Sequence, residues 1–384
     1  MVKIAFVTTF DGADILNWSG LSYYMSKSLA TDNCSLSYVG NLKRVVSWVD
    51  SIKKIKCRLF SDKDFVLDRT IAVSRHYSQQ VQKRIGGSHY DCILSPGSIP
   101  VAYLNTKTPK IIYTDATFAS MLDYYGGFSN LSHETIRQGH AIEKQALQNC
   151  DLAIYSSDWA ARSAINDYGA NPEKVKVIPF GANLDLNLSQ SEVETMIVAR
   201  STDKLRILFN GVDWERKGGS LVLLAAERIR QSGLDVELHI VGARNLDKAI
   251  LPSYVVYHGF LNKSVVAEMQ TLQRLYQDCH FLFVPSNAEA YGLVFCEANA
   301  YGMPAFAKDT GGISTIISNG KNGFALAGAE DVNVYADLMC RYFLDRKEYI
   351  KLALSSYREY QTRLNWKVAG DALQEQIRWV LNKK

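Results

Sequence analysis

Two glutamates separated by eight positions follow an apolar run in the stretch "FLFVPSNAEAYGLVFCEANAYGMP", residues 281–304. They are Glu289 and Glu297, and Gly292 stands between them. Ser286 is a residue type that starts helices well, and a glycine lets the backbone come close to a ligand. The stretch is therefore typical of a buried strand that turns into a helix, with two carboxylates near the turn.

The chemistry that this arrangement favours is the binding of an anion that carries sugars. A helix N-terminus presents backbone N–H groups and favours negative charge. An anion at this one would meet Ala290, Tyr291, Gly292 and Leu293. A phosphate between two sugars fits, with a ribose on Glu297 and a hexose on Glu289. The spacing alone also allows an ordinary pair among 39 acidic residues, with Glu289 as a helix-dipole partner and Glu297 facing solvent.

Short apolar strands alternate with helical stretches along almost the whole chain. Continuous apolar strands between helices indicate parallel sheets covered on both faces, and ligands of such sheets bind beyond the carboxyl ends of the strands. The fold class is therefore α/β, with two doubly wound Rossmann-like domains facing a central cleft. Strands are expected at 3–9, 92–95, 110–115, 152–157, 175–181, 205–211, 236–242, 254–259, 281–286, 304–309 and 323–326, and helices at 134–149, 157–168, 218–232, 263–278, 292–301 and 332–344.

The domain division falls at a polar stretch without a strand pattern, residues 182–204, which we interpret as a linker. It separates an N-terminal domain, 1–182, from a C-terminal domain, 183–364. The last segment, 365–384, has a helical apolar face and either closes the second domain or packs back on the first.

The composition describes a globular chain of 384 residues with 47% apolar residues and a net charge of +4. That charge is too mild to indicate nucleic-acid binding. No run of eighteen apolar residues and no signal-peptide pattern occurs. Seven scattered cysteines without a CxxC indicate neither a disulfide framework nor a zinc site and favour the cytoplasm. The first strand lacks a following GxGxxG, which argues against a dinucleotide dehydrogenase.

The run from 281 to 326 resembles the signature of the family 4 retaining glycosyltransferases, which have the GT-B fold. The matching parts are the strand ending in Pro-Ser, two glutamates eight apart, the glycine after the first, Gly-x-Pro, a Gly-Gly pair and "NGKNGFAL". The resemblance implies transfer of a hexose from a nucleotide-diphosphate sugar, with retention and without a metal or other cofactor. UDP-glucose is the first expected donor, because it is common in the family, and GDP-mannose is the second.

The resemblance continues upstream in "LRILFNGVDWERKGGSLVLLAAERI", residues 205–229. In the family a basic pair here holds the donor diphosphate. Lys217 matches the lysine, whereas Val212 stands at the usual arginine position and Arg216 is the nearest substitute. Such cations would offset the charge of the leaving pyrophosphate; the ordinary alternative is an exposed charged turn.

Two further segments carry donor-side and acceptor-side expectations. The loop "YHGFLN", 257–262, resembles the family's base-edging loop through Gly259 and Phe260, although Phe260 fits a core position equally well. In the first domain Gly20, after Ser19, matches the family's glycine loop near the donor phosphate. Asp115, at the end of the strand 110–115, is the acceptor-side polar candidate.

The segment 41–90 is basic, with eleven Lys and Arg against four Asp, and it interleaves Trp48, Phe60 and Phe65. This composition favours a solvated face and leaves peripheral contact with the inner face of a membrane as the alternative. The Asp62-Lys63-Asp64 triplet is interpreted as a solvated loop and not as a metal site.

The resemblance therefore implies a hexosyltransferase of polysaccharide or glycoconjugate biosynthesis. Its N-terminal domain, 1–182, would bind the acceptor, and its C-terminal domain, 183–364, would bind the nucleotide sugar. Glu289 would grip the sugar, and the acceptor would be a glycan, a lipid-linked glycan or a small molecule. A GT-B epimerase and a noncatalytic nucleotide-sugar-binding protein remain as alternatives.

Overall fold

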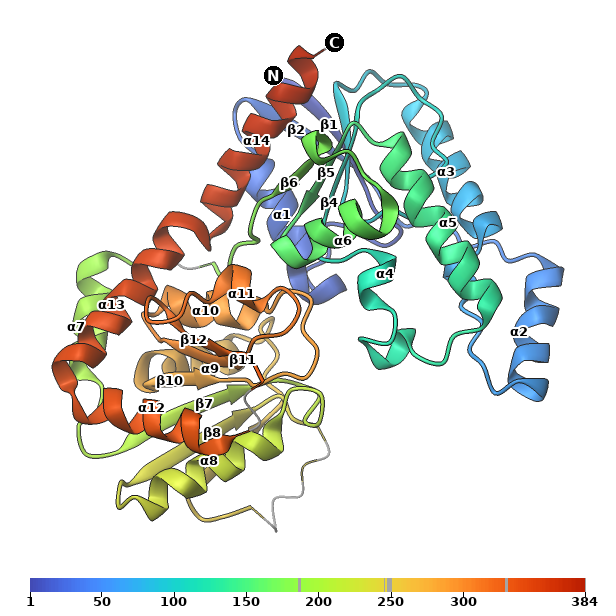
Figure 1. Ribbon diagram of the computed structural model, residues 1–384. Coiled ribbons are helices and arrows are strands. Elements are labelled where there is room, and N and C mark those ends of the chain that lie inside the picture. Colours follow the sequence, from blue (N-terminus) through green and yellow to red (C-terminus); the bar gives the residue numbers. More distant parts are fainter. Residues whose placement is uncertain (186–187, 245, 247–250, 329–330, 384) are drawn as a thin grey trace. The chain divides into compact units, whose positions relative to one another are not determined.

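The computed structural model describes residues 1–185, 188–244, 246, 251–328 and 331–383. The chain forms two compact units, which are described separately (Figure 1). Unit 1 comprises Met1–Asn183 and Trp366–Lys384, and unit 2 comprises Leu184–Asn365. No helix among the described residues combines the length and apolar character needed to cross a membrane.

Unit 1 is built on a six-stranded parallel sheet, whose inner strands are short apolar runs buried on both faces. Strand β2 was not predicted, because two serines interrupt its sequence "CSLSYV" and it lies at an edge of the sheet, where Ser37 and Tyr38 are exposed. The order across the sheet is β2 (Cys34–Val39), β1 (Val2–Val7), β3 (Cys92–Ser95), β4 (Lys110–Thr114), β5 (Leu152–Tyr155) and β6 (Val175–Val177).

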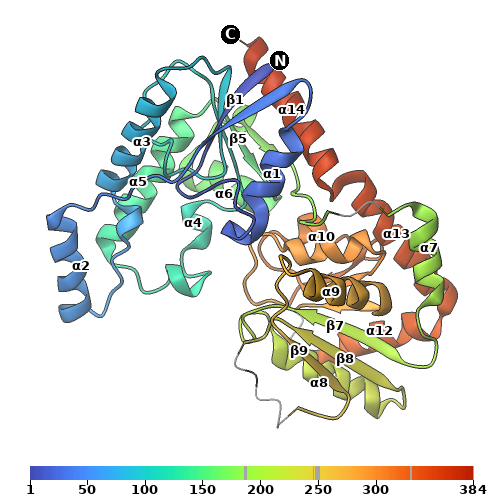
Figure 2. The same ribbon diagram turned by 180° about the vertical axis from the view of Figure 1, so that it is seen from behind.

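The helices of unit 1 cover this sheet, and the C-terminal helix belongs to it. Residues of α3, α5 and α6 share a buried apolar cluster with the strands, and α1 packs against α14 (Figures 1 and 2). Trp366 at the start of α14 donates to Asn183 Oδ1 over 2.8 Å and stacks on Phe180. The helices are α1 (Leu21–Leu29), α2 (Trp48–Phe60), α3 (Ile71–Ile85), α4 (Phe118–Met121), α5 (His133–Asn149), α6 (Asp158–Tyr168) and α14 (Trp366–Asn382).

Unit 2 holds a second six-stranded parallel sheet, which confirms the predicted class of two doubly wound α/β domains. Its order is β12 (Gly323–Leu326), β11 (Ala305–Lys308), β10 (Phe281–Phe283), β7 (Leu205–Asn210), β8 (Val236–Val241) and β9 (Val255–Gly259). Helix α8 packs against α12, and α13 packs against α7 and α10. The helices are α7 (Gln190–Ala199), α8 (Gly219–Gln231), α9 (Val266–Asp278), α10 (Leu293–Ala300), α11 (Ile313–Ile316), α12 (Val332–Leu344) and α13 (Arg346–Arg363).

The interpretation of 182–204 as a linker is wrong, because helix α7 occupies half of it. Ser189 and Glu192 form a capping box at its start, a signature that the sequence already contained. Val193 and Ile197 are buried in unit 2. The sequence did not predict this helix because four of its five apolar residues are consecutive, Met196–Ala199, and do not recur along one face.

Each sheet reverses its strand order at one place, and this locates the ligand crevice. The reversal lies between β1 and β3 in unit 1 and between β7 and β10 in unit 2. Loops that leave adjacent strands at such a switch point diverge to opposite faces and leave a crevice at the carboxyl ends. Of the predicted site residues, Arg216 and Lys217 follow β7, the stretch 289–297 follows β10 and Gly20 follows β1. Asp115 instead follows β4, and Gly259 and Phe260 lie at the end of β9.

Candidate functional site

The switch point of unit 2 brings Lys217 and Glu289 together. Lys217 follows β7 and Glu289 follows β10, and the Lys217 ammonium forms an ion pair with Glu289 Oε2. Ser286 Oγ donates to the same carboxylate oxygen over 3.2 Å. Both charged side chains are largely buried, so their mutual attraction is screened less than at an exposed surface.

A glycine makes this meeting of loops possible. Gly218 has a φ of +74°, and a Cβ there would lie 2.3 Å from the carbonyl oxygen of Pro285. Only a residue without a side chain permits that approach of the two backbones. Gly218, which directly follows the predicted Lys217, therefore allows the β7 and β10 loops to lie this close together.

Arg216 ties the same two loops together by different bonds. Its guanidinium donates to the carbonyl oxygen of Ala288 over 3.0 Å and pairs with Asp213 over 3.3 Å. Its own carbonyl oxygen accepts from the N–H of Asn287 over 2.8 Å. The structure thus places Arg216 beside Lys217 at the switch point, as a clamp on the β10 loop.

The N-terminus of α10 faces the crevice directly after Glu289. Gly292 is the N-cap residue with a φ of +100°, and it has no side-chain cap in the part of unit 2 that the structure describes. Ala290 and Tyr291 are buried and Leu293 is half-buried. The predicted anion position, a helix N-terminus behind a buried carboxylate, is present as a local geometry.

Glu297 is buried inside a polar network, so the alternative of a solvent-facing helix residue is wrong. Lys263 forms an ion pair with Glu297 Oε1. Tyr276 Oη donates to Oε2 over 2.9 Å and accepts from Asn210 Nδ2 over 3.0 Å. Burial, with Glu297 nearby, raises the pKa of Tyr276 well above its ordinary value, so the phenol stays a donor.

Sequence reasoning missed Lys263, Tyr276 and Asn210. Lys263 directly follows the loop "YHGFLN", which is the one local signal that pointed toward it. A carboxylate accepts up to about four hydrogen bonds, so Glu297 retains capacity for a hydroxyl pair. Whether it binds a ribose stays a prediction.

The loop after β9 places an aromatic side chain at the surface. Gly259 has a φ of +73°, and its carbonyl oxygen accepts from Gly242 N–H over 2.8 Å. Phe260 is 50% exposed, so the core alternative for it is wrong. The Arg244 guanidinium lies 4.9 Å from its ring centre. A half-exposed ring with a cation on it is suited to stacking on a flat base.

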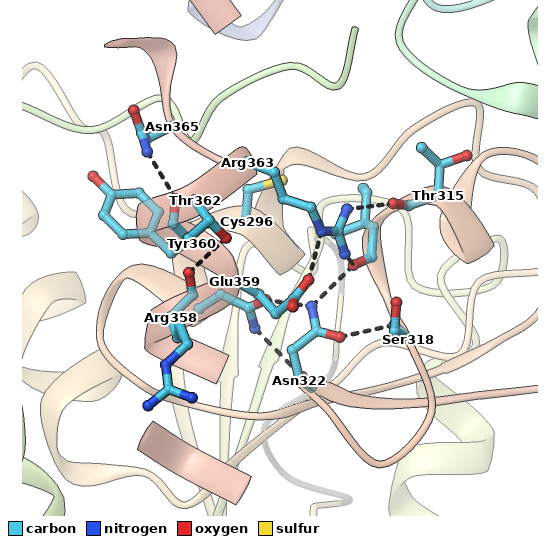
Figure 3. Close-up of polar contacts among 12 residues, drawn as sticks. Cys296, Thr315, Ser318, Asn322, Arg358, Glu359, Tyr360, Thr362, Arg363 and Asn365 are labelled. Atoms are coloured by element: carbon cyan, nitrogen blue, oxygen red, sulfur yellow. Dashed lines mark hydrogen bonds and ion pairs between the residues drawn. The ribbon is translucent and has the colours of Figure 1, made fainter. Parts of the chain in front are cut away.

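Hydrogen bonds from the α11 segment and from the end of α13 support the loop that carries Glu289. Glu289 accepts at its carbonyl oxygen from Gly312 N–H over 3.1 Å, just before α11. Arg363, at the end of α13, donates to the carbonyl oxygens of Thr315 and Ile316 over 2.6 and 2.5 Å (Figure 3). Asn322 also donates to Ile316 O, over 2.9 Å. The end of α13 therefore fixes the loop that supports Glu289.

Unit 1 has its own pocket at its own switch point, with a volume of about 360 Å³. The loops after β1, β3 and β4 line it, and Asp115 stands at the carboxyl end of β4. Asp115, the predicted acceptor-side carboxylate, thus lines a cavity of unit 1. Trp18, Ser95, Pro96, Ser98, Arg69 and Glu143 are among the other lining residues.

The turn before α1 is strained next to this pocket. Trp18, Ser19 and Gly20 have φ values of 48°, 55° and 81°, all left-handed. Only glycine adopts such values cheaply, and strained segments cluster at functional sites. Asn183 Nδ2 holds the turn by donating to Ser19 O over 2.8 Å. Gly20 is thereby placed at the N-cap of α1.

Arg69 and Glu143 are pocket residues that no sequence motif indicated. Burial lowers the pKa of the Arg69 guanidinium, which the Glu143 charge opposes. Burial raises the pKa of Glu143. A 2.7 Å hydrogen bond from Ser98 and the charge of Arg69 act in the opposite direction and lower that pKa, but burial has the larger effect. Arg69 stacks on Phe118 and Phe128 at 5.0 and 5.4 Å. Its side chain makes no hydrogen bond with any residue that the structure describes.

The Asp62-Lys63-Asp64 triplet lies in an exposed loop, as expected for a solvated segment. Within the described ranges, no three His, Cys, Asp or Glu side chains cluster as metal ligands would.

Comparison with known proteins gives a consistent likeness. Residues 204–345 match the family model described as "Glycosyl transferases group 1". The chain is 26% identical over 248 residues to a D-inositol 3-phosphate glycosyltransferase of Corynebacterium jeikeium, covering 60% of this chain and 58% of that protein. The chain thus spans less than two thirds of the length of that curated relative.

Among solved structures, the sucrose-phosphate synthase of Thermosynechococcus elongatus aligns with a TM-score of 0.70 at 17% identity, over the whole of both chains. Anabaena Alr3699/HepE, solved in complex with UDP, aligns with a TM-score of 0.67 at 15% identity, over 99% of this chain and 100% of that one. At these identities the likeness shows the fold.

Proposed function

We propose that this chain, a family 4-like protein with the GT-B fold, transfers a hexose from a nucleotide-diphosphate sugar to an acceptor hydroxyl. The observation that carries the proposal is the buried Lys217–Glu289 pair at the switch point of unit 2, directly before the N-terminus of α10. A cation, a carboxylate and a helix start together are suited to a diphosphate that bears a sugar.

The donor would be bound by unit 2 in three parts. Glu297 would accept the ribose hydroxyls, and Phe260 and Gly259 would edge the base. Lys217, Arg216 and the backbone of Ala290, Tyr291, Gly292 and Leu293 would bind the diphosphate, leaving Glu289 for the hexose hydroxyls. UDP-glucose is our first donor, supported by the solved UDP and UDP-glucose complexes of Alr3699/HepE.

The reaction would retain the anomeric configuration. The bond between the anomeric carbon and the phosphate oxygen breaks as the acceptor oxygen attacks from the same face. The acceptor proton passes to the departing phosphate oxygen. Glu289 would not attack, because Lys217 and Ser286 hold its carboxylate. Lys217 would stabilise the charge that grows on the leaving diphosphate, so we propose that no metal takes part.

The acceptor would be bound in the unit 1 pocket. Its volume of about 360 Å³ suits one sugar ring or a small polyol at the end of a larger acceptor. The Asp115 carboxylate would accept hydrogen bonds from the hydroxyls of the acceptor. The Arg69 guanidinium would donate hydrogen bonds to the oxygens of the acceptor. The relative's name includes a phosphorylated inositol, a polyol of this size. Contact of the basic segment 41–90 with a membrane belongs to the same proposal.

The test begins with calorimetry of UDP, GDP, ADP and their hexoses, with and without EDTA. We expect one nucleotide to bind, and EDTA to leave its Kd unchanged. The donor that binds is then mixed with candidate polyol and glycan acceptors, and free nucleotide is measured. Release that depends on acceptor supports transfer.

Other outcomes separate the alternatives. An altered sugar configuration without an acceptor would indicate an epimerase. Tight binding without turnover for any acceptor would indicate a nucleotide-sugar-binding protein. Failure of every nucleotide to bind would contradict the whole assignment of the unit 2 site.

A further inference from the structure

Helix α2 of unit 1 presents a row of large apolar side chains to solvent. Trp48, Ile52, Ile55 and Leu59 recur at intervals of four, three and four residues, which places them on one helix face. Trp48, Ile55 and Leu59 are 75%, 58% and 69% exposed. We call these four residues the apolar row.

The opposite face of α2 is polar, and that face contacts the protein. Asp50 is buried and accepts from Ser47 Oγ over 2.8 Å. Lys53 pairs over 2.5 Å with Glu134 in the first turn of α5. A surface helix normally buries its apolar stripe and exposes its polar face. In α2 this orientation is inverted, so the apolar row is not there to pack the fold.

The edge position of the helix supports the same conclusion. In both views α2 stands at the margin of unit 1, outside α3 and α5 (Figures 1 and 2). Phe60, at its end, is also exposed. Apolar side chains grouped in this way are unfavourable in water and mark a surface that is covered by something else.

The charges around the row identify what covers it. Between Trp48 and Phe60 the helix carries four basic residues and one acidic residue. Successive helix residues are about 100° apart. Lys54 and Arg58 therefore flank the apolar row on one side and Lys56 flanks it on the other, and all three are exposed.

We propose that α2 docks unit 1 on an anionic lipid bilayer, lying in the plane of the interface. The apolar row would enter the boundary between headgroups and acyl chains, and the flanking cations would extend to lipid phosphates. A second copy of the chain fits less well, because it would set the same cations against each other. This inference deepens the membrane contact proposed above for the segment 41–90, to which α2 belongs. It uses none of the residues assigned to the donor or the acceptor, so sugar transfer can be tested apart from it.

The test is flotation of the full chain with vesicles of phosphatidylcholine alone, or with about a third phosphatidylglycerol. We expect binding to the anionic vesicles only, weakening as salt rises. Ile55→Ser/Leu59→Ser should lower the vesicle affinity at least tenfold. The matched control is Leu224→Ser/Val266→Ser, which removes two apolar side chains of unit 2 that are 59% and 73% exposed; its affinity should not change.

The charge arm uses Lys54→Gln/Lys56→Gln/Arg58→Gln, against Lys321→Gln/Lys347→Gln/Lys351→Gln as the control of equal charge change. Only the first should lose the preference for anionic vesicles. Melting temperatures equal to wild type would show that the exposed substitutions leave the fold intact.

Three results would overturn the proposal. One is no binding of the wild type to anionic vesicles, and another is equal binding of the Ile55→Ser/Leu59→Ser variant. The third is concentration-dependent dimerisation that this variant abolishes, because the apolar row would then cover a second copy. Nucleotide binding, measured on the same samples, keeps these outcomes separate from those of the proposed transfer.

Discussion

Lys217 and Glu289 neutralise each other in a largely buried place, and this decides what each can do. Leaving either buried charge unpaired would cost free energy, so the ion pair fixes the position of both side chains. A diphosphate entering beside Lys217 would share its cation, while Glu289 would turn its remaining lone pairs to sugar hydroxyls. The pair therefore supports the proposed binding of an anionic ligand with hydroxyls close to it.

We predict that Lys217→Ala lowers kcat by a factor of about 10²–10³, because a cation that stabilises the leaving diphosphate is lost. The measurement is the initial rate at saturating donor. Lys217→Ala/Glu289→Gln tests whether the unpaired carboxylate causes the loss, and Lys347→Ala is the exposed-lysine control. An unchanged kcat in Lys217→Ala would remove the diphosphate role from this residue.

We predict that Glu297→Gln raises the Kd of the free nucleotide about tenfold or more, a loss of about 1.4 kcal/mol, with a smaller effect on kcat. The reason is that a ribose hydroxyl bonds more strongly to a carboxylate than to an amide. Calorimetry with the free nucleotide measures it. Tyr276→Phe removes a partner of Glu297 but keeps its charge, and should bind nearly normally. A Kd that does not move in Glu297→Gln would contradict the ribose role.

At the scale of elements, the site consists of two loops that leave β7 and β10 side by side. Their strands pair in register, with Phe281 beside Ile207, so the loops start from a fixed spacing. Gly218 then lets them touch, and Arg363 of α13 holds the α11 segment behind Glu289. The position of each functional side chain thus depends on elements distant in sequence.

We predict that Gly218→Ala destabilises unit 2 by about 2 kcal/mol more than Gly233→Ala and also weakens nucleotide binding. Both glycines have left-handed backbone conformations, with φ of +74° and +92°. Substitution by alanine therefore costs about 1–2 kcal/mol of backbone strain at each position. Only a Cβ at Gly218 would meet a neighbour, at 2.3 Å from Pro285 O. Urea unfolding measures both variants. Equal losses would mean that the two loops relax without cost.

At the scale of the whole molecule, buried polar side chains hold together the elements of unit 2 through hydrogen bonds. Arg200, just after α7, is buried and donates to the carbonyl oxygens of Gly302 and Tyr301 over 2.8 and 2.7 Å. His280 before β10 accepts at Nδ1 from Arg206 N–H over 3.0 Å, and its Nε2 lies 2.7 Å from Ser201 O. These bonds require a neutral His280.

We predict that unit 2 loses about 2 kcal/mol of stability through His280 between pH 7.5 and pH 5. Burial, with the nearby cations Arg200 and Arg346, lowers the pKa of His280 to about 3, from 6.5. The neutral ring stabilises the fold fully above pH 6.5, and that contribution is lost as the pH falls toward 3. Urea unfolding at both pH values measures it. His280→Gln should depend less on pH by about this amount; an identical slope would contradict the assignment.

The sequence by itself determined the two parallel sheets and the order of the motif residues. Strands such as β4 and β5 are continuous apolar runs, and their character is local, so it can be read without knowing their neighbours. The motif around Glu289 and Glu297 could be read in the same way, because its strand, turn and helix are consecutive. The missed strand β2 and helix α7 have weaker local patterns, and burial by distant elements decides them.

Only the tertiary structure decided which side chains meet. Lys263 reaches Glu297 from 34 positions away, and Arg69 and Glu143 reach the unit 1 pocket from separate elements. The same holds for α2, whose composition allowed a solvated face or contact with a membrane; only the structure shows that the apolar row points outward. Contacts between residues far apart in the chain depend on how the elements pack, and periodicity along one segment does not contain that information.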